Sequence, residues 1–296
     1  MRRMVVTVTL LLVCLLVLSA GCALASTGAK RDRQGILLVA FGTSEPDARP
    51  AIDNIATAVR RAFPGVEVRL SYTSNIIRKK ILREELLAID PPTVALAKMH
   101  DEGFNSVVVQ SLHIIPGEEF SGLSELVRAF SGIEGKWGFD RLVLGRPLLD
   151  RMEDYQNVAG LLTSKYQHLV KDGGAVVFMG HGTHHEANAA YSKLQLLLDE
   201  EGLPFVIGLV EAFPGLDTVK RRLKELNPSR VTLVPFMVVA GDHAKNDMAD
   251  EDDPESWISE LRGEGHEVGA LLEGLGDGEG AADLFIGHIR EAMERD

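Results

Sequence analysis

Three polar residues with the chemistry of metal ligands follow apolar segments in the second half of the chain. His181 and Glu211 stand at the ends of two apolar runs, and His243 follows a third. Parallel strands bring their carboxyl ends to one edge of a sheet, so these side chains are expected to converge. Two imidazoles and a carboxylate suit Co²⁺, Fe²⁺, Ni²⁺ or Zn²⁺ better than Mg²⁺ or Ca²⁺, and they leave coordination positions open. The pattern therefore predicts a divalent-metal site; the alternative for each residue alone is a polar group that caps a strand.

Two glycine loops are candidates for binding an anionic substrate. Gly42 and Gly182 each follow an apolar run and precede a helical segment, so their backbone amides lie where a helix N-terminus attracts anions. Neither loop matches a nucleotide-binding sequence, so no nucleotide is expected. Ser44, in the first loop, lacks the surroundings of a hydrolase nucleophile and is instead a candidate for substrate binding.

His113 and Arg78 are further candidates for substrate binding. His113 lies near the end of an apolar run, where it is either a hydrogen-bonded core residue or an imidazole that faces the substrate and moves protons. Arg78 begins a basic cluster that is either a solvated helix face or a wall facing an anion. Two more histidines, His184 and His185, lie close to the predicted ligands. The remaining ones are expected at the solvated surface: His100, His168, His266 and His288.

The elements that would position these residues alternate between apolar runs and helical segments. The runs show no polar alternation, which is typical of parallel strands covered on both faces. The sequence therefore predicts an α/β fold. The expected strands are 35–41, 66–72, 106–115, 175–179, 205–210 and 231–239, and the expected helices are 51–63, 76–87, 93–102, 187–201, 216–226 and 281–294.

The second half of the chain repeats the pattern of the first. Residues 41–44 match 181–184, residues 68–71 match 208–211, and residues 116–118 match 240–242. We expect two similar domains, each a parallel sheet flanked by helices, with the ligand in a cleft between them. The N-terminal domain is expected over residues 35–145 and the C-terminal domain, which carries the metal site, over 146–296, with the last helix crossing back to the first domain.

Residues 1–25 have the features of a cleavable signal peptide: a basic start, an apolar run and a small-residue ending. A linker is expected over residues 26–34. Cleavage predicts a periplasmic protein with no membrane span; the alternative is a lipoprotein anchored at Cys22. The chain's other cysteine, Cys14, lies in the same segment, so the mature chain is expected to have no disulfide and no cysteine nucleophile.

The composition is that of a folded globular protein. Of 296 residues, 45% are hydrophobic and 25% are charged. The 43 acidic residues exceed the 31 basic ones and give a net charge of −12, which argues against a nucleic-acid partner.

Several motifs resemble those of the anaerobic sirohydrochlorin cobaltochelatases. They are QSLHIIPGEEF at 110–120, MGHGTH at 179–184 and PFMVVAGDHAKNDM at 235–248. The resemblance implies the two-domain fold of the class II chelatases, a tetrapyrrole in the cleft and a homo-oligomer. It also implies that the metal is held by His181, His243 and Glu211.

The expected activity is insertion of Co²⁺, or Fe²⁺, into sirohydrochlorin with release of two protons, as in cobalamin biosynthesis. His181 or His243 is the expected proton acceptor. One alternative is an exported metal or haem carrier without turnover, in which a surface histidine such as His100 holds the haem. Another is a siroheme-type ferrochelatase that uses the same residues. The substrate-binding candidates are those given above: His113, Ser44, Arg78, Gly42 and Gly182.

Overall fold

The computed structural model describes residues 33–295. The predicted signal peptide 1–25, the lipoprotein position Cys22 and nearly all of the predicted linker lie outside the described residues. From Gln34 onward the chain forms one compact unit. None of the helices within 33–295 combines the length and the apolar character needed to cross a membrane.

The fold contains two parallel sheets with the same strand order. The first sheet has the order β2-β1-β3-β4 and consists of β1 (Gln34–Ala40), β2 (Glu67–Tyr72), β3 (Ser106–Ser111) and β4 (Arg141–Gly145). The second has the order β6-β5-β7-β8 and consists of β5 (Gly174–Gly180), β6 (Phe205–Leu209), β7 (Arg230–Pro235) and β8 (Val268–Ala270). This arrangement confirms the predicted α/β class.

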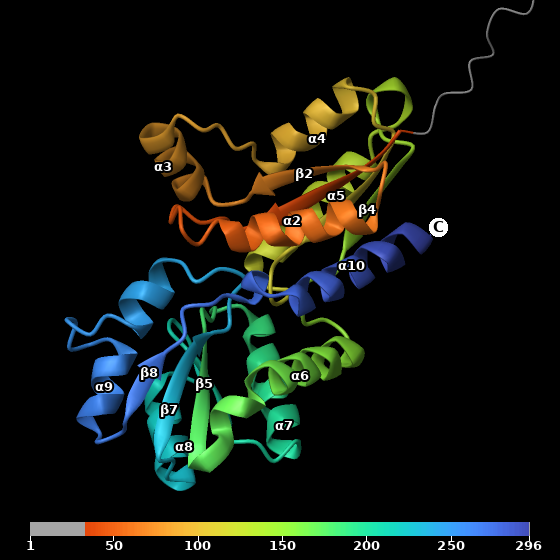
Figure 1. Cartoon of the computed structure of the whole chain (residues 1–296). Coiled ribbons are helices and arrows are strands. Elements are labelled where there is room, and N and C mark those ends of the chain that lie inside the picture. Colours follow the sequence, from red (N-terminus) through yellow and green to blue (C-terminus); the bar gives the residue numbers. More distant parts are fainter. Residues whose placement is uncertain (1–32, 296) are drawn as a thin grey trace, which may run out of the picture. The chain divides into compact units, whose positions relative to one another are not determined.

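Helices connect the strands in each half (Figure 1). The helices are α2 (Pro50–Ala62), α3 (Asn75–Glu85), α4 (Pro92–Asp101), α5 (Glu118–Ser131), α6 (Met152–Tyr166), α7 (Ala189–Glu200), α8 (Leu216–Leu226), α9 (Trp257–Gly263) and α10 (Glu279–Glu294). Short helical turns are η1 (Gly135–Trp137), η2 (Gln167–Gly173), η3 (Glu186–Asn188), η4 (Ala244–Met248) and η5 (Leu275–Asp277). The sequence analysis did not predict α5, α6, α9 or the edge strands β4 and β8.

Both faces of the first sheet are buried, which explains its unbroken apolar runs. In β1, Ile36 and Leu38 face a core formed with α2 and α10, whereas Leu37 and Val39 face a core formed with α4 and α5. Successive side chains of a strand point to opposite faces, so a strand covered on both sides needs apolar residues at every position.

One core cluster contains residues from both sheets. It includes Leu38 of β1, Phe178 of β5 and Phe285 of α10. Helix α10 packs along α2 and also contacts β3 and β4 of the first sheet (Figure 1). The predicted boundary between two domains, at residues 145 and 146, stays a prediction. Both halves contribute to this core cluster, so the cluster does not separate them at that point.

Two strands are shorter than the sequence predicts. β3 ends at Ser111 instead of 115, and β7 ends at Pro235 instead of 239. Each of them pairs with the central strand of its sheet, β1 for β3 and β5 for β7. The last hydrogen bonds to these central strands are donated by the backbone N–H groups of Leu112 and Phe236. Burial keeps the following residues apolar, but without a partner strand they form loops. His113 therefore lies just beyond β3.

The strand register corrects one match between the halves. Ala40 of β1 pairs with Tyr72 of β2, and Gly180 of β5 pairs with Leu209 of β6. Leu209 is therefore equivalent to Tyr72, and Glu211 is equivalent to Ser74, three positions later than the match of 68–71 with 208–211 implies.

The expectation that His288 is a solvated surface residue is wrong. His288 lies on the inner side of α10 and is only 5% exposed. Its Nε2 is 2.9 Å from an Asp154 carboxylate oxygen, and its Nδ1 is 3.2 Å from the backbone carbonyl oxygen of Arg146. These partners lie more than 130 positions earlier in the chain, so the charged residues beside His288 in the sequence did not indicate its surroundings.

Candidate metal centre

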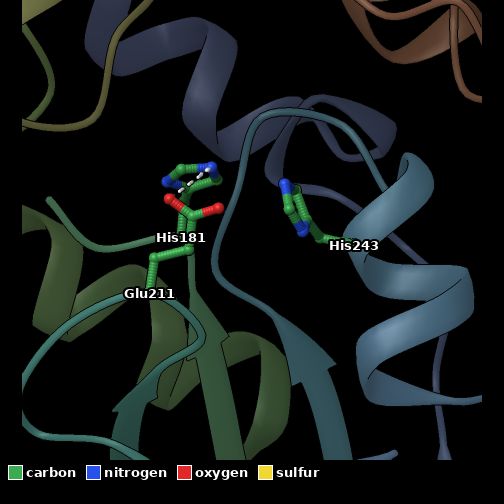
Figure 2. A group of neighbouring side chains, drawn as sticks. All are labelled: His181, Glu211 and His243. Carbon is green, nitrogen blue, oxygen red and sulfur yellow. Dashed lines mark ion pairs between the residues drawn. The ribbon is translucent and has the colours of Figure 1, made fainter.

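Three side chains converge at the carboxyl edge of the second sheet. His181 follows β5, Glu211 follows β6 and His243 immediately precedes the π-helical turn η4 (Figure 2). One ligand atom from each lies within 4.8 Å of the other two, and no other set of three potential ligands gathers in this way within residues 33–295. The His181 Nε2 and Glu211 Oε2 atoms are 3.8 Å apart. The two imidazole rings are perpendicular, with centroids 4.7 Å apart. The structure thus brings together all three predicted ligands.

Hydrogen bonds leave the Nε2 atom of each histidine available. The Nδ1 atom of His181 is 2.8 Å from the carbonyl oxygen of Gly182, which can only accept, so Nδ1 carries the proton. The Nδ1 atom of His243 is 2.6 Å from the Asp247 carboxylate, which fixes the same tautomer. Each imidazole therefore presents an Nε2 lone pair, the form in which histidine binds a metal.

The centre is open to solvent. The side chains of His181, Glu211 and His243 are 44%, 56% and 35% exposed. Two ligand atoms that share a tetrahedral ion at about 2.1 Å lie roughly 3.4 Å apart, so the present spacing needs only small side-chain rotations to close on an ion. Two nitrogens and an oxygen form an incomplete coordination shell, which suits an ion that enters and leaves.

A glycine turn positions His181. Gly182 has a φ of +85°, and a Cβ built there would lie 2.8 Å from the Cβ of Ala212. The turn after β1 is built in the same way: Gly42 has a φ of +103°, and a Cβ there would lie 2.5 Å from the Tyr72 ring. Both glycines are therefore required by backbone conformation and by close packing. Their predicted role in substrate binding stays a prediction.

A lysine ties the turn η4 to the first sheet. The Lys245 ammonium group lies 2.8 Å from a Glu45 oxygen and 2.7 Å from an Asp47 oxygen, both in the loop between β1 and α2. The bond to Lys245 lowers the pKa of Asp47, and the two carboxylates raise the pKa of Lys245. Nearby, a Cβ at Gly241 would lie 3.3 Å from the Thr43 hydroxyl oxygen. The carboxyl ends of the two sheets thus meet beside His243.

His113 lies outside the metal group but has an unusual environment. Its Nδ1 is 2.8 Å from the Ser111 hydroxyl oxygen, and its Nε2 is buried without a hydrogen-bond partner among the described residues. Burial lowers the pKa of His113 to about 4, so the imidazole is neutral at neutral pH.

The remaining candidates do not belong to the group of three ligands. Arg78 donates from Nε to the carbonyl oxygen of Ile89 and from Nη1 to Asn75, so part of its guanidinium group holds the chain around α3. Ser44 is half-buried in the loop after β1. His184 and His185 are exposed, and His185 caps η3 by accepting a bond from the Ala187 N–H.

Asp247 and Lys245 were not predicted to support the site. Asp247 begins an acidic segment, residues 247–253. The spacing of four between His243 and Asp247 is the available signal, because residues four apart lie on one face of a helical turn.

The family of the chain follows from comparison with known proteins. A family model described as "Cobalt chelatase (CbiK)" matches residues 34–294. The chain belongs to this family. The matched range contains all three metal-centre residues, both sheets and α10.

Two curated relatives align with most of this chain. The sirohydrochlorin cobaltochelatase of Salmonella typhimurium is 34% identical over 264 residues, which covers 88% of this chain and 97% of the relative. The sirohydrochlorin cobaltochelatase CbiKC of Nitratidesulfovibrio vulgaris is 36% identical over 261 residues, which covers 88% of this chain and 91% of the relative.

A solved structure supports the fold. SirB from Bacillus subtilis, determined with Fe³⁺, superposes with a TM-score of 0.59 at 16% identity, covering 88% of this chain and 96% of SirB. At this identity the likeness concerns the arrangement of strands and helices alone.

Proposed function

We propose that this chain is a sirohydrochlorin cobaltochelatase, an enzyme that inserts Co²⁺ into sirohydrochlorin and releases two protons. The family assignment and the two curated relatives support this function. The observation that carries it is the open centre of His181, Glu211 and His243, in which both Nε2 atoms are available.

The residues of the centre supply both parts of the reaction. His181, Glu211 and His243 hold Co²⁺ next to the macrocycle, which removes part of the ion's water shell and provides proximity. When the ion moves to the pyrrole nitrogens, each imidazole loses its metal and its Nε2 lone pair becomes free to accept a proton. Two imidazoles thus match the two N–H protons that leave the ring.

The other predicted contacts concern the tetrapyrrole. Its carboxylates must approach a protein with a net charge of −12, so local donors are needed. We assign this role to the amides of Gly42 and Gly182, the Ser44 hydroxyl and the Arg78 guanidinium group. His113, neutral and with an unpartnered Nε2, is the proposed contact near the end of β3.

Replacing both histidines of the centre tests the function directly. The variant His181→Ala/His243→Ala is expected to lose insertion of Co²⁺ above the uncatalysed rate, because two of the three ligands are gone. The assay follows the absorption spectrum of sirohydrochlorin under anaerobic conditions. The matched control is His168→Ala/His266→Ala, two histidines outside the centre, which should retain wild-type turnover. Undiminished insertion by the first variant would contradict the proposed site.

The same assay separates the alternatives. A carrier without turnover would bind Co²⁺ or haem but leave the insertion rate at the uncatalysed value. A siroheme-type ferrochelatase would prefer Fe²⁺ when both ions are offered together. The names of the family and of both relatives favour cobalt.

We also propose that the chain is exported to the periplasm and assembles as a homo-oligomer. The signal-peptide pattern of residues 1–25 supports export. The oligomer rests on the family resemblance alone. N-terminal sequencing of periplasmic protein should give Ser26 as the first residue, and light scattering should give a mass above 32.2 kDa. A retained Met1 contradicts export by cleavage.

A further inference from the structure

The two histidines of the metal centre are held by different kinds of acceptor. His181 donates to a backbone carbonyl that belongs to the adjacent residue, Gly182. His243 donates to the carboxylate of Asp247, four positions along the chain, at 2.6 Å. The first acceptor is fixed by the backbone, whereas the second is a side chain that a single substitution removes.

The position of His243 makes the second bond more consequential. His243 is the residue before η4 and projects toward the centre from that turn, while His181 continues from the end of a strand (Figure 2). Its side chain is 35% exposed, so packing alone does not restrict the ring. A neutral imidazole without a partner at Nδ1 can place its proton on either nitrogen and can rotate about its bond to Cβ. Only the tautomer protonated at Nδ1 offers Nε2 to an ion.

We propose that Asp247 is a positioning residue that holds His243 with Nδ1 protonated and Nε2 facing the metal. The inference rests on the proposed role of His243 as a ligand for Co²⁺. Carboxylates that orient a metal-binding imidazole also increase its strength as a ligand, and losing such a partner typically weakens metal affinity by about 10- to 100-fold.

The turn η4 supports this assignment. His243 and Asp247 lie on one side of the π-helical turn, and Lys245 between them is bonded to Glu45 and Asp47. In the same turn, Asn246 donates to Asp242 at 2.9 Å. The backbone that carries the histidine and the carboxylate is thus anchored separately, so removing the Asp247 carboxylate is expected to release the ring and leave the turn in place.

The test compares Asp247→Asn, Asp247→Ala and Asp247→Glu with Asp252→Asn. The last variant removes the same charge from an exposed position in the same acidic segment. Two readouts use the protein without tetrapyrrole: the Kd for Co²⁺ from titration, and the ring ¹⁵N shifts of His243 from NMR, assigned by their loss in His243→Ala. The shifts report the tautomer directly, which a merely structural role of Asp247 would leave unchanged.

Asp247→Ala is expected to populate both tautomers of His243 and to raise the Kd for Co²⁺ by about 10- to 100-fold. Asp247→Glu should restore much of both properties, and Asp252→Asn should match the wild type. A His243 ring that keeps its Nδ1 proton in Asp247→Ala and Asp247→Asn, with a Kd within twofold of the wild type, overturns the inference. If Asp247→Ala fails to fold, the comparison of Asp247→Asn with Asp247→Glu decides it.

These readouts are independent of insertion activity. Failure of the wild type to metallate sirohydrochlorin would contradict the proposed function while the effect of Asp247 on Co²⁺ binding stands. A fully active Asp247→Ala with an unchanged tautomer would contradict the inference while the proposed function stands.

Discussion

At the scale of single residues, burial of His113 makes folding sensitive to acid. Its pKa is lowered from an ordinary value of 6.5 to about 4, and burial is the cause. Between pH 6.5 and pH 4 the unfolded chain binds a proton that the folded chain does not, so the free energy of unfolding decreases as the pH falls. From pH 6.5 to 5 this decrease is about 2 kcal/mol.

The prediction is that His113→Gln flattens this part of the pH profile. Urea denaturation at pH 7 and pH 5 measures it: the fall in unfolding free energy between the two should be about 2 kcal/mol smaller in His113→Gln than in the wild type. His168→Gln changes an exposed histidine and should keep the wild-type difference. An equal fall in wild type and His113→Gln would show that His113 is protonated in the folded state.

Gly182 gives a second prediction at this scale. Gly182→Ala forces a positive φ on a residue with a Cβ and pushes that Cβ against Ala212. We expect a loss of about 1–3 kcal/mol in unfolding free energy and weaker Co²⁺ binding, because the carbonyl that holds His181 moves. Gly265→Ala is the matched control: its φ is +92°, but nothing lies within 4 Å of the added Cβ. If both variants lose Co²⁺ affinity equally, the close packing at Gly182 is not what positions His181.

The grouping of His181, Glu211 and His243 could be predicted because each follows a strand of the same parallel sheet, and such residues meet at one edge. The sequence was insufficient for Asp247, whose role depends on the unusual turn η4, and for His288, whose partners come from a distant segment. For His113 the apolar run left two alternatives open, a hydrogen-bonded core residue or an imidazole that faces the substrate; the structure buries its Nε2 and places its Nδ1 beside Ser111.

At the scale of elements, the turn η4 depends on its tie to the loop after β1. Lys245→Met removes two ion pairs, but Asp47 is 71% exposed and such pairs contribute little to stability, typically under about 1 kcal/mol. The expected effect is instead on Co²⁺ binding, with the Kd raised several-fold because η4 carries both His243 and Asp247.

The control for this prediction is Lys220→Met. Lys220 lies on α8, outside the metal centre, and also pairs with two carboxylates, those of Glu260 and Glu264. Titration with Co²⁺ and thermal unfolding should show a similar stability change in both variants and an affinity change in Lys245→Met alone. An unchanged Kd in Lys245→Met would mean that η4 keeps its conformation without the tie.

Element types were easier to predict than element ends. The sequence pattern closely matches the central strands β1 and β5 and the helices α2 and α8. Long segments with a clear apolar pattern are the easiest to recognise in a sequence. The ends of β3 and β7 depend on where the neighbouring strand stops, and the short edge strands β4 and β8 depend on pairing that the sequence does not reveal.

At the scale of the whole molecule, a buried polar network fastens α10 to the chain around α6. Arg146 pairs with Asp154 at 2.8 Å and also with Glu291, and His288 bonds the same Asp154 oxygen. Burial acts to raise the pKa of Asp154, but hydrogen bonds from Arg151, His288 and Arg146 lower it overall. The carboxylate is therefore charged at neutral pH and compensates a buried guanidinium group.

Asp154→Asn is expected to reduce the unfolding free energy by about 3–5 kcal/mol, since it removes the buried carboxylate that pairs with the buried Arg146. Asp150→Asn removes a carboxylate that is 3.5 Å from the Arg146 Nε and 35% exposed, and should cost less than about 1 kcal/mol. Urea denaturation at pH 7 measures both. A loss from Asp154→Asn no larger than that from Asp150→Asn would show that Glu291 alone compensates Arg146.

The repeated pattern in the sequence predicted two similar halves, and the strand orders confirm the repetition. The sequence analysis expected the last helix to cross to the first half, and α10 contacts α2, β3 and β4 there. The single core cluster that joins the two sheets was not predicted, because its residues lie far apart in the chain.

The shared strand order also leads to a prediction of how many metal ions one chain binds. The residue that matches His181 in the first half is Phe41, and the one that matches Glu211 is Ser74. The same scaffold therefore occurs twice, yet in the first half these two positions hold an aromatic ring, 47% exposed, and a helix-capping hydroxyl. Saturation with Co²⁺ should thus occur at one equivalent per chain, although the scaffold occurs twice.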